Sequence, residues 1–112
     1  MRRISPPPEY HGEPCSIVGI GCATGVHPTF KTSHDDGYMT LKDQNKFVRH
    51  FCRVKKYTYY KRAERPKLKD LHIQGKALVC VYGHFLYLEG ETYWSFFNNE
   101  NDDVVAVWEL KE

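Results

Sequence analysis

The sequence lacks the features that mark membrane, secreted or zinc-binding proteins. No apolar run approaches the roughly 20 residues that a helix needs to cross a bilayer. Residues 1–8 are basic and then proline-rich, without the apolar core of a secretory signal. None of the four cysteines forms a pair with two residues between them, so we expect no metal site and no cofactor. These absences predict a cytoplasmic protein without membrane contact, whose cysteines are free thiols.

The composition is that of one ordinary folded domain. The chain has 112 residues, of which 41% are hydrophobic and 27% charged, and its net charge is only +2. A charge this small does not argue for nucleic acid or an anionic membrane as a partner. Three consecutive prolines predict an extended arm over residues 1–13. We expect residues 14–112 to form a single domain.

Helical patterns precede strand patterns along the chain. The apolar stretch 15–24 fits either a short strand or a helix bounded by Pro14 and Gly25. Residues 40–52 have apolar side chains at helical spacing, whereas residues 53–62 are aromatic and β-branched and favour a strand.

The segment after residue 76 has the strongest strand signal. Four apolar runs are separated by turns at Gly83, at residues 89–91 and at residues 98–103, which predicts an antiparallel meander. The fold class expected is therefore α+β, with N-terminal helices packed on a C-terminal antiparallel sheet.

Two residues stand in settings that suit nucleophilic catalysis. Cys15 follows Pro14 at the possible start of a helix, where unpaired backbone N–H groups stabilise a thiolate. His84 begins a strand in the most apolar part of the chain and shares a face with Leu86 and Leu88. A thiolate with a nearby imidazole is the usual pair for acyl transfer. The alternatives are an inert buried thiol and a hydrogen-bonded histidine at the edge of the core.

These two segments together resemble the papain-like cysteine peptidases. Residues 13–25 resemble the family's nucleophile helix, and residues 79–93 resemble its hairpin with a Gly-His pair at the start of a strand. The resemblance is to minimal members, such as the bacteriocin-leader peptidases and the small papain-like proteins of tailed bacteriophages. It implies a papain-like fold, with Cys15 as nucleophile and His84 as base acting on a protein or peptide substrate.

The chain departs from the family pattern at two places. Members usually orient the histidine with an Asn or Asp about 10 to 16 residues later; Asn98 is the nearest such residue here and Asn99 the next. Both also fit a simple turn before Glu100. Many members carry a Gln shortly before the cysteine to complete the oxyanion hole, whereas residues 9–13 here include two glutamates and no Gln.

Charge is segregated along the chain. Residues 53–69 hold eight basic residues against one acidic residue, and residues 89–112 hold seven acidic residues against one lysine. Basic and aromatic side chains interleave in the first segment, a pattern that can bind single-stranded nucleic acid or a partner protein. A solvated edge strand protected by lysines is the more common explanation. The residues concerned are Lys55, Lys56, Tyr57, Tyr59, Lys61 and Arg62.

The sequence thus predicts a small cysteine peptidase or amidase, of the kind that phages produce in the host cytosol. The alternative is a non-catalytic binding protein on the same scaffold, such as a phage inhibitor of a host factor. Nucleic-acid binding ranks below both, because it depends on residues 53–69 alone.

Overall fold

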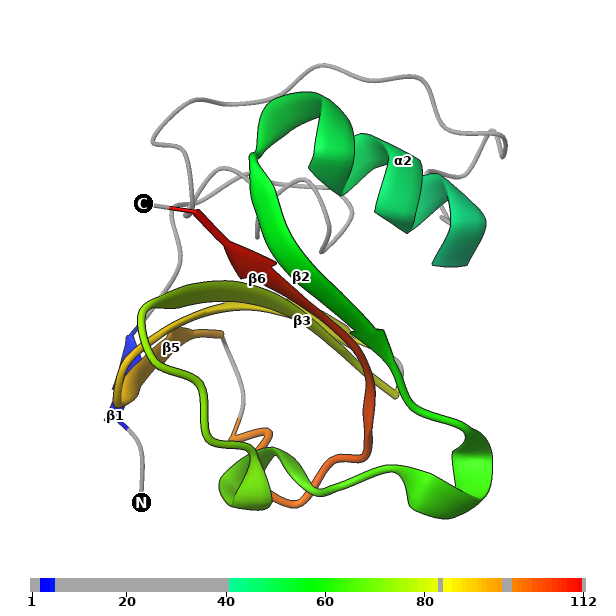
Figure 1. The fold of residues 1–112 in the computed structure, drawn as a ribbon. Coiled ribbons are helices and arrows are strands. Elements are labelled where there is room, and N and C mark those ends of the chain that lie inside the picture. Colours follow the sequence, from blue (N-terminus) through cyan, green and yellow to red (C-terminus); the bar gives the residue numbers. More distant parts are fainter. Residues whose placement is uncertain (1–2, 6–40, 83, 96–97, 112) are drawn as a thin grey trace.

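A computed structural model describes residues 3–5, 41–82, 84–95 and 98–111 (Figure 1). The described part combines one α-helix with a six-stranded mixed sheet, so the fold is α+β. The elements in chain order are β1 (Arg3–Ser5), α2 (Leu41–Phe51), β2 (Val54–Tyr59), two short 3-10 helices (Arg62–Glu64 and Leu68–Asp70), β3 (Lys76–Val81), β4 (His84–Glu89), β5 (Thr92–Trp94) and β6 (Val104–Leu110).

The helix α2 begins and ends within a residue of the range predicted from the sequence. Asp43 lies in its first turn, and Arg49 and His50 lie in its last turn. Acidic side chains near the start of a helix and basic side chains near its end interact favourably with the helix dipole. Phe47 and Val48 are fully buried against the sheet, and the opposite side of the helix is polar. The expectation of several N-terminal helices is not met in the described residues, which hold this one α-helix; residues 15–24 lie outside them.

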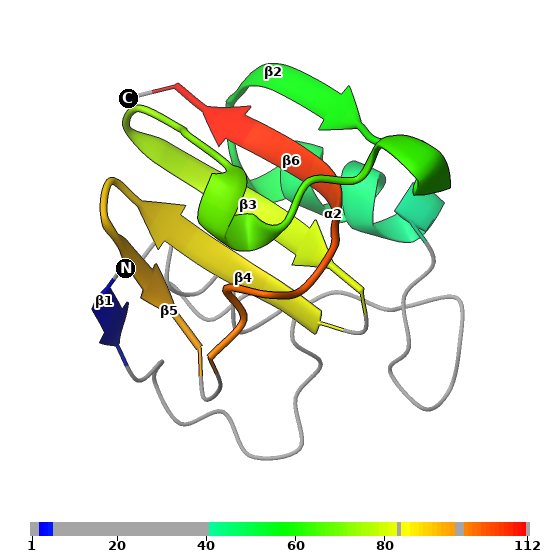
Figure 2. The same cartoon turned by 90° about the horizontal axis from the view of Figure 1, so that it is seen from below.

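The strand order is β1-β5-β4-β3-β6-β2 (Figure 2). Strands β3, β4 and β5 form the meander that was predicted, but β6 does not continue it. Instead β6 returns and pairs antiparallel with β3 on one side and with β2 on the other. The prediction of a four-stranded meander was therefore wrong at β6. Its side chains are buried on both faces, and a strand of this kind is stable only inside a sheet.

The first strand also corrects the expected sheet. Residues 3–5 of the predicted arm are extended, and they pair parallel with β5, with Arg3 opposite Thr92. The Arg3 backbone N–H donates to the Glu91 carbonyl oxygen at 2.7 Å. The sheet is therefore mixed rather than wholly antiparallel, because its first strand comes from a distant part of the chain.

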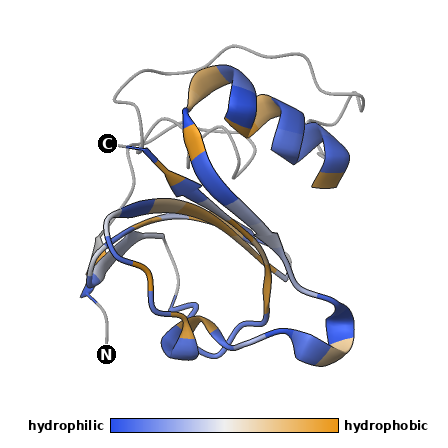
Figure 3. Cartoon of the chain, viewed as in Figure 1, coloured by the Kyte–Doolittle hydropathy of each residue, from blue (hydrophilic) through white to orange (hydrophobic). Residues whose placement is uncertain are grey.

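Each face of the sheet has its own hydrophobic core. On one face, Phe47 and Val48 of α2 pack with Trp108, Leu78 and Tyr87. On the other face, the connection from β2 to β3 packs Leu68 and Leu71 over a second set of strand residues: Ala77, Val79, Val81, Leu86, Leu88, Tyr93, Val104 and Val107. Hydrophobic residues accordingly concentrate on the central strands, and much of the edge strand β2 is hydrophilic (Figure 3). No described helix is long and apolar enough to cross a membrane.

Candidate functional site

His84 is the part of the expected catalytic pair that the structure describes. It begins β4, opposite Val81 in the β3–β4 hairpin, and its ring is partly buried. It lies on the strand face of Leu86 and Leu88, which belong to the core under the β2–β3 connection. Cys15 lies outside the described residues.

A chain of hydrogen bonds leads away from the His84 ring. Nε2 lies 3.1 Å from the hydroxyl oxygen of Ser95, just after β5. The Ser95 hydroxyl donates to Oδ1 of Asn99 at 2.6 Å. The amide nitrogen of Asn99 donates in turn to a carboxylate oxygen of Asp102 at 2.6 Å. We call these four residues the His84 relay; its two middle members, Ser95 and Asn99, are buried.

The direction of each bond in the His84 relay follows from donor chemistry. The Asp102 carboxylate only accepts, so the Asn99 NH₂ group faces it and the Asn99 carbonyl faces Ser95. Ser95 has one hydroxyl proton, which it donates to Asn99, so its oxygen accepts the Nε2–H of His84. In the neutral ring the proton is then on Nε2 and the basic lone pair is on Nδ1.

Burial sets the protonation state of this ring. It lowers the pKa of His84 below its ordinary value of 6.5, because a low-dielectric setting penalises the imidazolium, and Asp102 opposes the shift more weakly. His84 is therefore predominantly neutral at pH 7. A neutral imidazole with an oriented Nδ1 lone pair is able to accept a proton.

The loop that carries the His84 relay is held on several sides. The backbone N–H of Asn99 donates to the buried Tyr93 hydroxyl at 3.0 Å. The N–H of Leu68, on the β2–β3 connection, donates to the Asp102 carbonyl oxygen at 3.0 Å. Backbone and side-chain bonds to two other elements thus fix where Asn99 stands, and Asn99 in turn holds Ser95.

Asn98 plays a different part from the one expected. Its side chain accepts a hydrogen bond from the backbone N–H of Glu100 at 3.0 Å, and the residue is exposed. This is the turn geometry that the sequence offered as the alternative. The amide connected to His84 is Asn99, which acts through Ser95. Sequence reasoning passed over Ser95, although its position eleven residues after His84 lies within the spacing expected of an orienting residue.

The basic and aromatic residues of β2 do not form a single stacking surface. Tyr57 stacks on Trp108 at 5.3 Å between ring centroids, on the helix side of the sheet, and burial raises the pKa of its phenol. Tyr59 is half exposed. The expected basic partners of these rings are all exposed on or just after this edge strand: Lys55, Lys56, Lys61 and Arg62. One accessible ring among lysines is typical of a protected sheet edge.

Two of the other cysteines lie beside the helix-side core, as expected for structural thiols. Cys52 and Cys80 are partly buried and free, and burial raises the pKa of the Cys52 thiol. In the described ranges no three His, Cys, Asp or Glu side chains are grouped so as to hold a metal ion. Comparison with protein families, with curated proteins and with solved structures finds no match.

Proposed function

We propose that the chain is a small papain-like cysteine hydrolase that cleaves an amide bond in a protein or peptide, with Cys15 as nucleophile and His84 as base. The observation that carries this proposal is the His84 relay, in which Ser95 and Asn99 hold Nε2–H and leave Nδ1 as the basic nitrogen. The resemblance of residues 13–25 and 79–93 to the family supplies the nucleophile.

The steps of the proposed reaction follow from the two side chains. His84 Nδ1 takes the proton of the Cys15 thiol, and the thiolate attacks the amide carbonyl. The imidazolium then gives that proton to the leaving amine, which departs and leaves a thioester on Cys15. Water, deprotonated by the same imidazole, hydrolyses the thioester and restores the thiol. The neutral ground state of the partly buried His84 supports the first step, since the ring must accept a proton.

Ser95 and Asn99 have a positioning role in this proposal. A direct Asn or Asp neighbour orients the ring in most of the family, whereas here a serine hydroxyl stands between the ring and the amide. The substitution preserves the direction of the hydrogen bond, because the serine oxygen accepts from Nε2–H as an amide oxygen would. The resemblance to phage proteins favours a role in the host cytosol.

Selective alkylation of thiols tests the proposal. At about pH 6 iodoacetamide should modify Cys15 faster than the other three cysteines, because a neighbouring imidazole can take up the thiol proton at a pH where unassisted thiols stay protonated. His84→Gln should abolish the preference, and His50→Gln, which changes an exposed histidine on α2, should leave it intact. Equal labelling of the four thiols in the unaltered protein would overturn the proposal and favour the non-catalytic binding role.

A further inference from the structure

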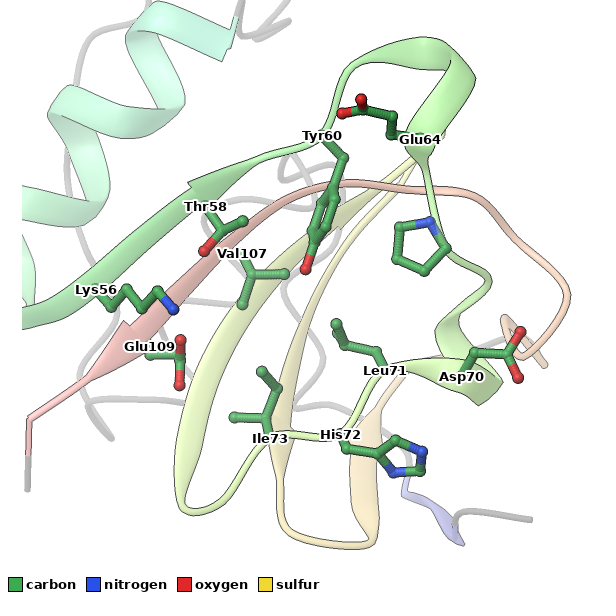
Figure 4. Close-up of a pocket in the computed structure, with 11 residues that line it drawn as sticks. Lys56, Thr58, Tyr60, Glu64, Asp70, Leu71, His72, Ile73, Val107 and Glu109 are labelled. Carbon is green, nitrogen blue, oxygen red and sulfur yellow. The ribbon is translucent and has the colours of Figure 1, made fainter.

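A pocket of about 450 Å³ lies on the side of the sheet opposite α2. Strands β2 and β6 form one wall, and the β2–β3 connection forms the other (Figure 4). None of the four residues of the His84 relay lines it. Its volume falls within the roughly 300–1,000 Å³ typical of small-molecule sites.

The floor of the pocket is apolar and one wall is aromatic. Val107, Leu71 and Ile73 contribute the aliphatic surface, and Figure 4 shows the Tyr60 side chain extending over the same space. Leu71 and Val107 are buried members of the core beneath, so this floor is rigid. Such a surface accepts a methylene chain, and the tyrosine ring offers a face to a cation.

The charged side chains around this floor are mostly acidic. Lys56 and Glu109 stand opposite each other on paired strands and offset one another. Glu64 and Asp70 then remain, and in the described part of the chain neither carboxylate takes part in an ion pair or side-chain hydrogen bond. Glu64 is also the single acidic residue of the segment 53–69, which otherwise carries eight basic residues. The pocket is thus a negative site inside a positive surface.

We propose that this pocket binds an organic cation with an aliphatic stem, an alkylguanidinium or alkylammonium group such as ends an arginine or lysine side chain. The stem lies on Ile73 above the buried Val107 and Leu71, the cationic head meets Glu64 and the Tyr60 ring, and Asp70 adds negative charge at the rim (Figure 4). An anion is disfavoured, because the lining has three carboxylates against one lysine. The basic residues around the pocket suit a ligand whose cation is flanked by acidic groups.

A pair of nearly isosteric probes tests the proposal. We expect n-butylguanidinium, titrated into the full chain at millimolar concentration, to shift the amide NMR signals of the lining residues. The neutral n-butylurea should bind about tenfold more weakly or worse, because it keeps the stem and loses the charge. Equal binding of the two probes, or no shifts with either, would overturn the proposal.

Variants locate the site. Glu64→Gln combined with Asp70→Asn should weaken n-butylguanidinium binding by about tenfold or more, since both carboxylates are lost without a change in size. The matched control is Glu89→Gln combined with Glu91→Gln, which neutralises two exposed carboxylates at the β4–β5 turn and should leave the affinity unchanged. All four positions are exposed, so the fold should be preserved, and a circular dichroism spectrum checks this. An unchanged affinity in the first variant would contradict the assignment.

Discussion

Nε2 of His84 lies 3.1 Å from the hydroxyl oxygen of Ser95, and this contact connects the start of β4 to the buried Asn99 beyond β5. It determines which ring nitrogen carries the proton and which carries the lone pair. It also joins His84, which the sequence suggested as a catalytic base, to Ser95, which the sequence did not single out.

Ser95→Ala should disturb the orientation of His84 without unfolding the protein. The substitution leaves the Nε2–H donor and the Asn99 carbonyl without their shared partner, which costs about 1–3 kcal/mol of unfolding free energy at a buried site. We expect the rate of Cys15 alkylation at about pH 6 to fall by at least tenfold. Ser95→Thr keeps the hydroxyl and should retain most of the rate. A rate unchanged in Ser95→Ala would rule out a positioning role for the relay.

Protein stability should decrease as the pH falls below about 6.5, and His84 should account for part of the decrease. Its pKa is lowered by burial in the folded state, so the unfolded chain binds the proton more readily. The stabilising contribution is complete above the unfolded pKa and is lost as the pH falls through the folded pKa. Urea unfolding at several values between about pH 8 and pH 5 measures this slope.

His84→Gln is the matching variant for that experiment. It removes the titrating group and keeps a donor for Ser95, so the slope of unfolding free energy against pH should flatten. His72→Gln, at an exposed position on the β2–β3 connection, should leave the slope as it is. Identical slopes for the native protein and His84→Gln would show that another group is responsible.

Trp108 and Asn45 should be energetically coupled. Nε1 of Trp108 donates to Oδ1 of Asn45 at 2.9 Å, and this bond ties β6 to α2. Trp108→Phe should lower the unfolding free energy by about 1–3 kcal/mol, through loss of this bond and of buried ring area. Adding Asn45→Ala should cost less than the sum of the two single changes, as a double-mutant cycle by urea unfolding would reveal. Strict additivity would show that the bond contributes nothing.

Gly90→Ala should destabilise the β4–β5 hairpin through its backbone alone. Gly90 has φ of +59°, and beyond its two chain neighbours no described residue has an atom within 4 Å of the position that a Cβ would take. The expected cost is therefore the left-handed conformation itself, about 1–2 kcal/mol. Gly90→Asn should cost less, because asparagine tolerates that region. If alanine and asparagine are equally stable in thermal unfolding, the backbone conformation is not the cause.

Individual helices and turns could be predicted from the sequence because each depends on a pattern of neighbouring residues. The helix over residues 41–51 and the turn at Gly90 follow from apolar spacing and from a residue suited to positive φ. The order in which the strands pair could not be predicted in this way. The four apolar runs at the end of the chain looked like a meander, and nothing near β6 indicates that it turns back to lie between β3 and β2.

The choice between Asn98 and Asn99 shows the same limit at the site. Both are adjacent asparagines in a polar turn, and spacing from His84 favoured Asn98 slightly. The Tyr93 hydroxyl and the β2–β3 connection position the loop so that Asn99 turns inward. Asn99 is buried and its neighbour Asn98 is exposed. The residues next to them in the sequence do not indicate which of the two side chains is the buried one.

The sequence by itself determined the α+β class, most element positions, the face on which His84 lies and the segregation of charge. These depend on periodicity and composition within about ten residues, which act before any distant contact forms. Tertiary structure alone decided the neighbours of β1 and β6, the Ser95–Asn99 link behind His84 and the acidic pocket beneath β2. The strand neighbours and the pocket join residues far apart in the chain, and the Ser95–Asn99 link depends on contacts of its loop with Tyr93 and with the β2–β3 connection, so local sequence patterns do not determine any of them.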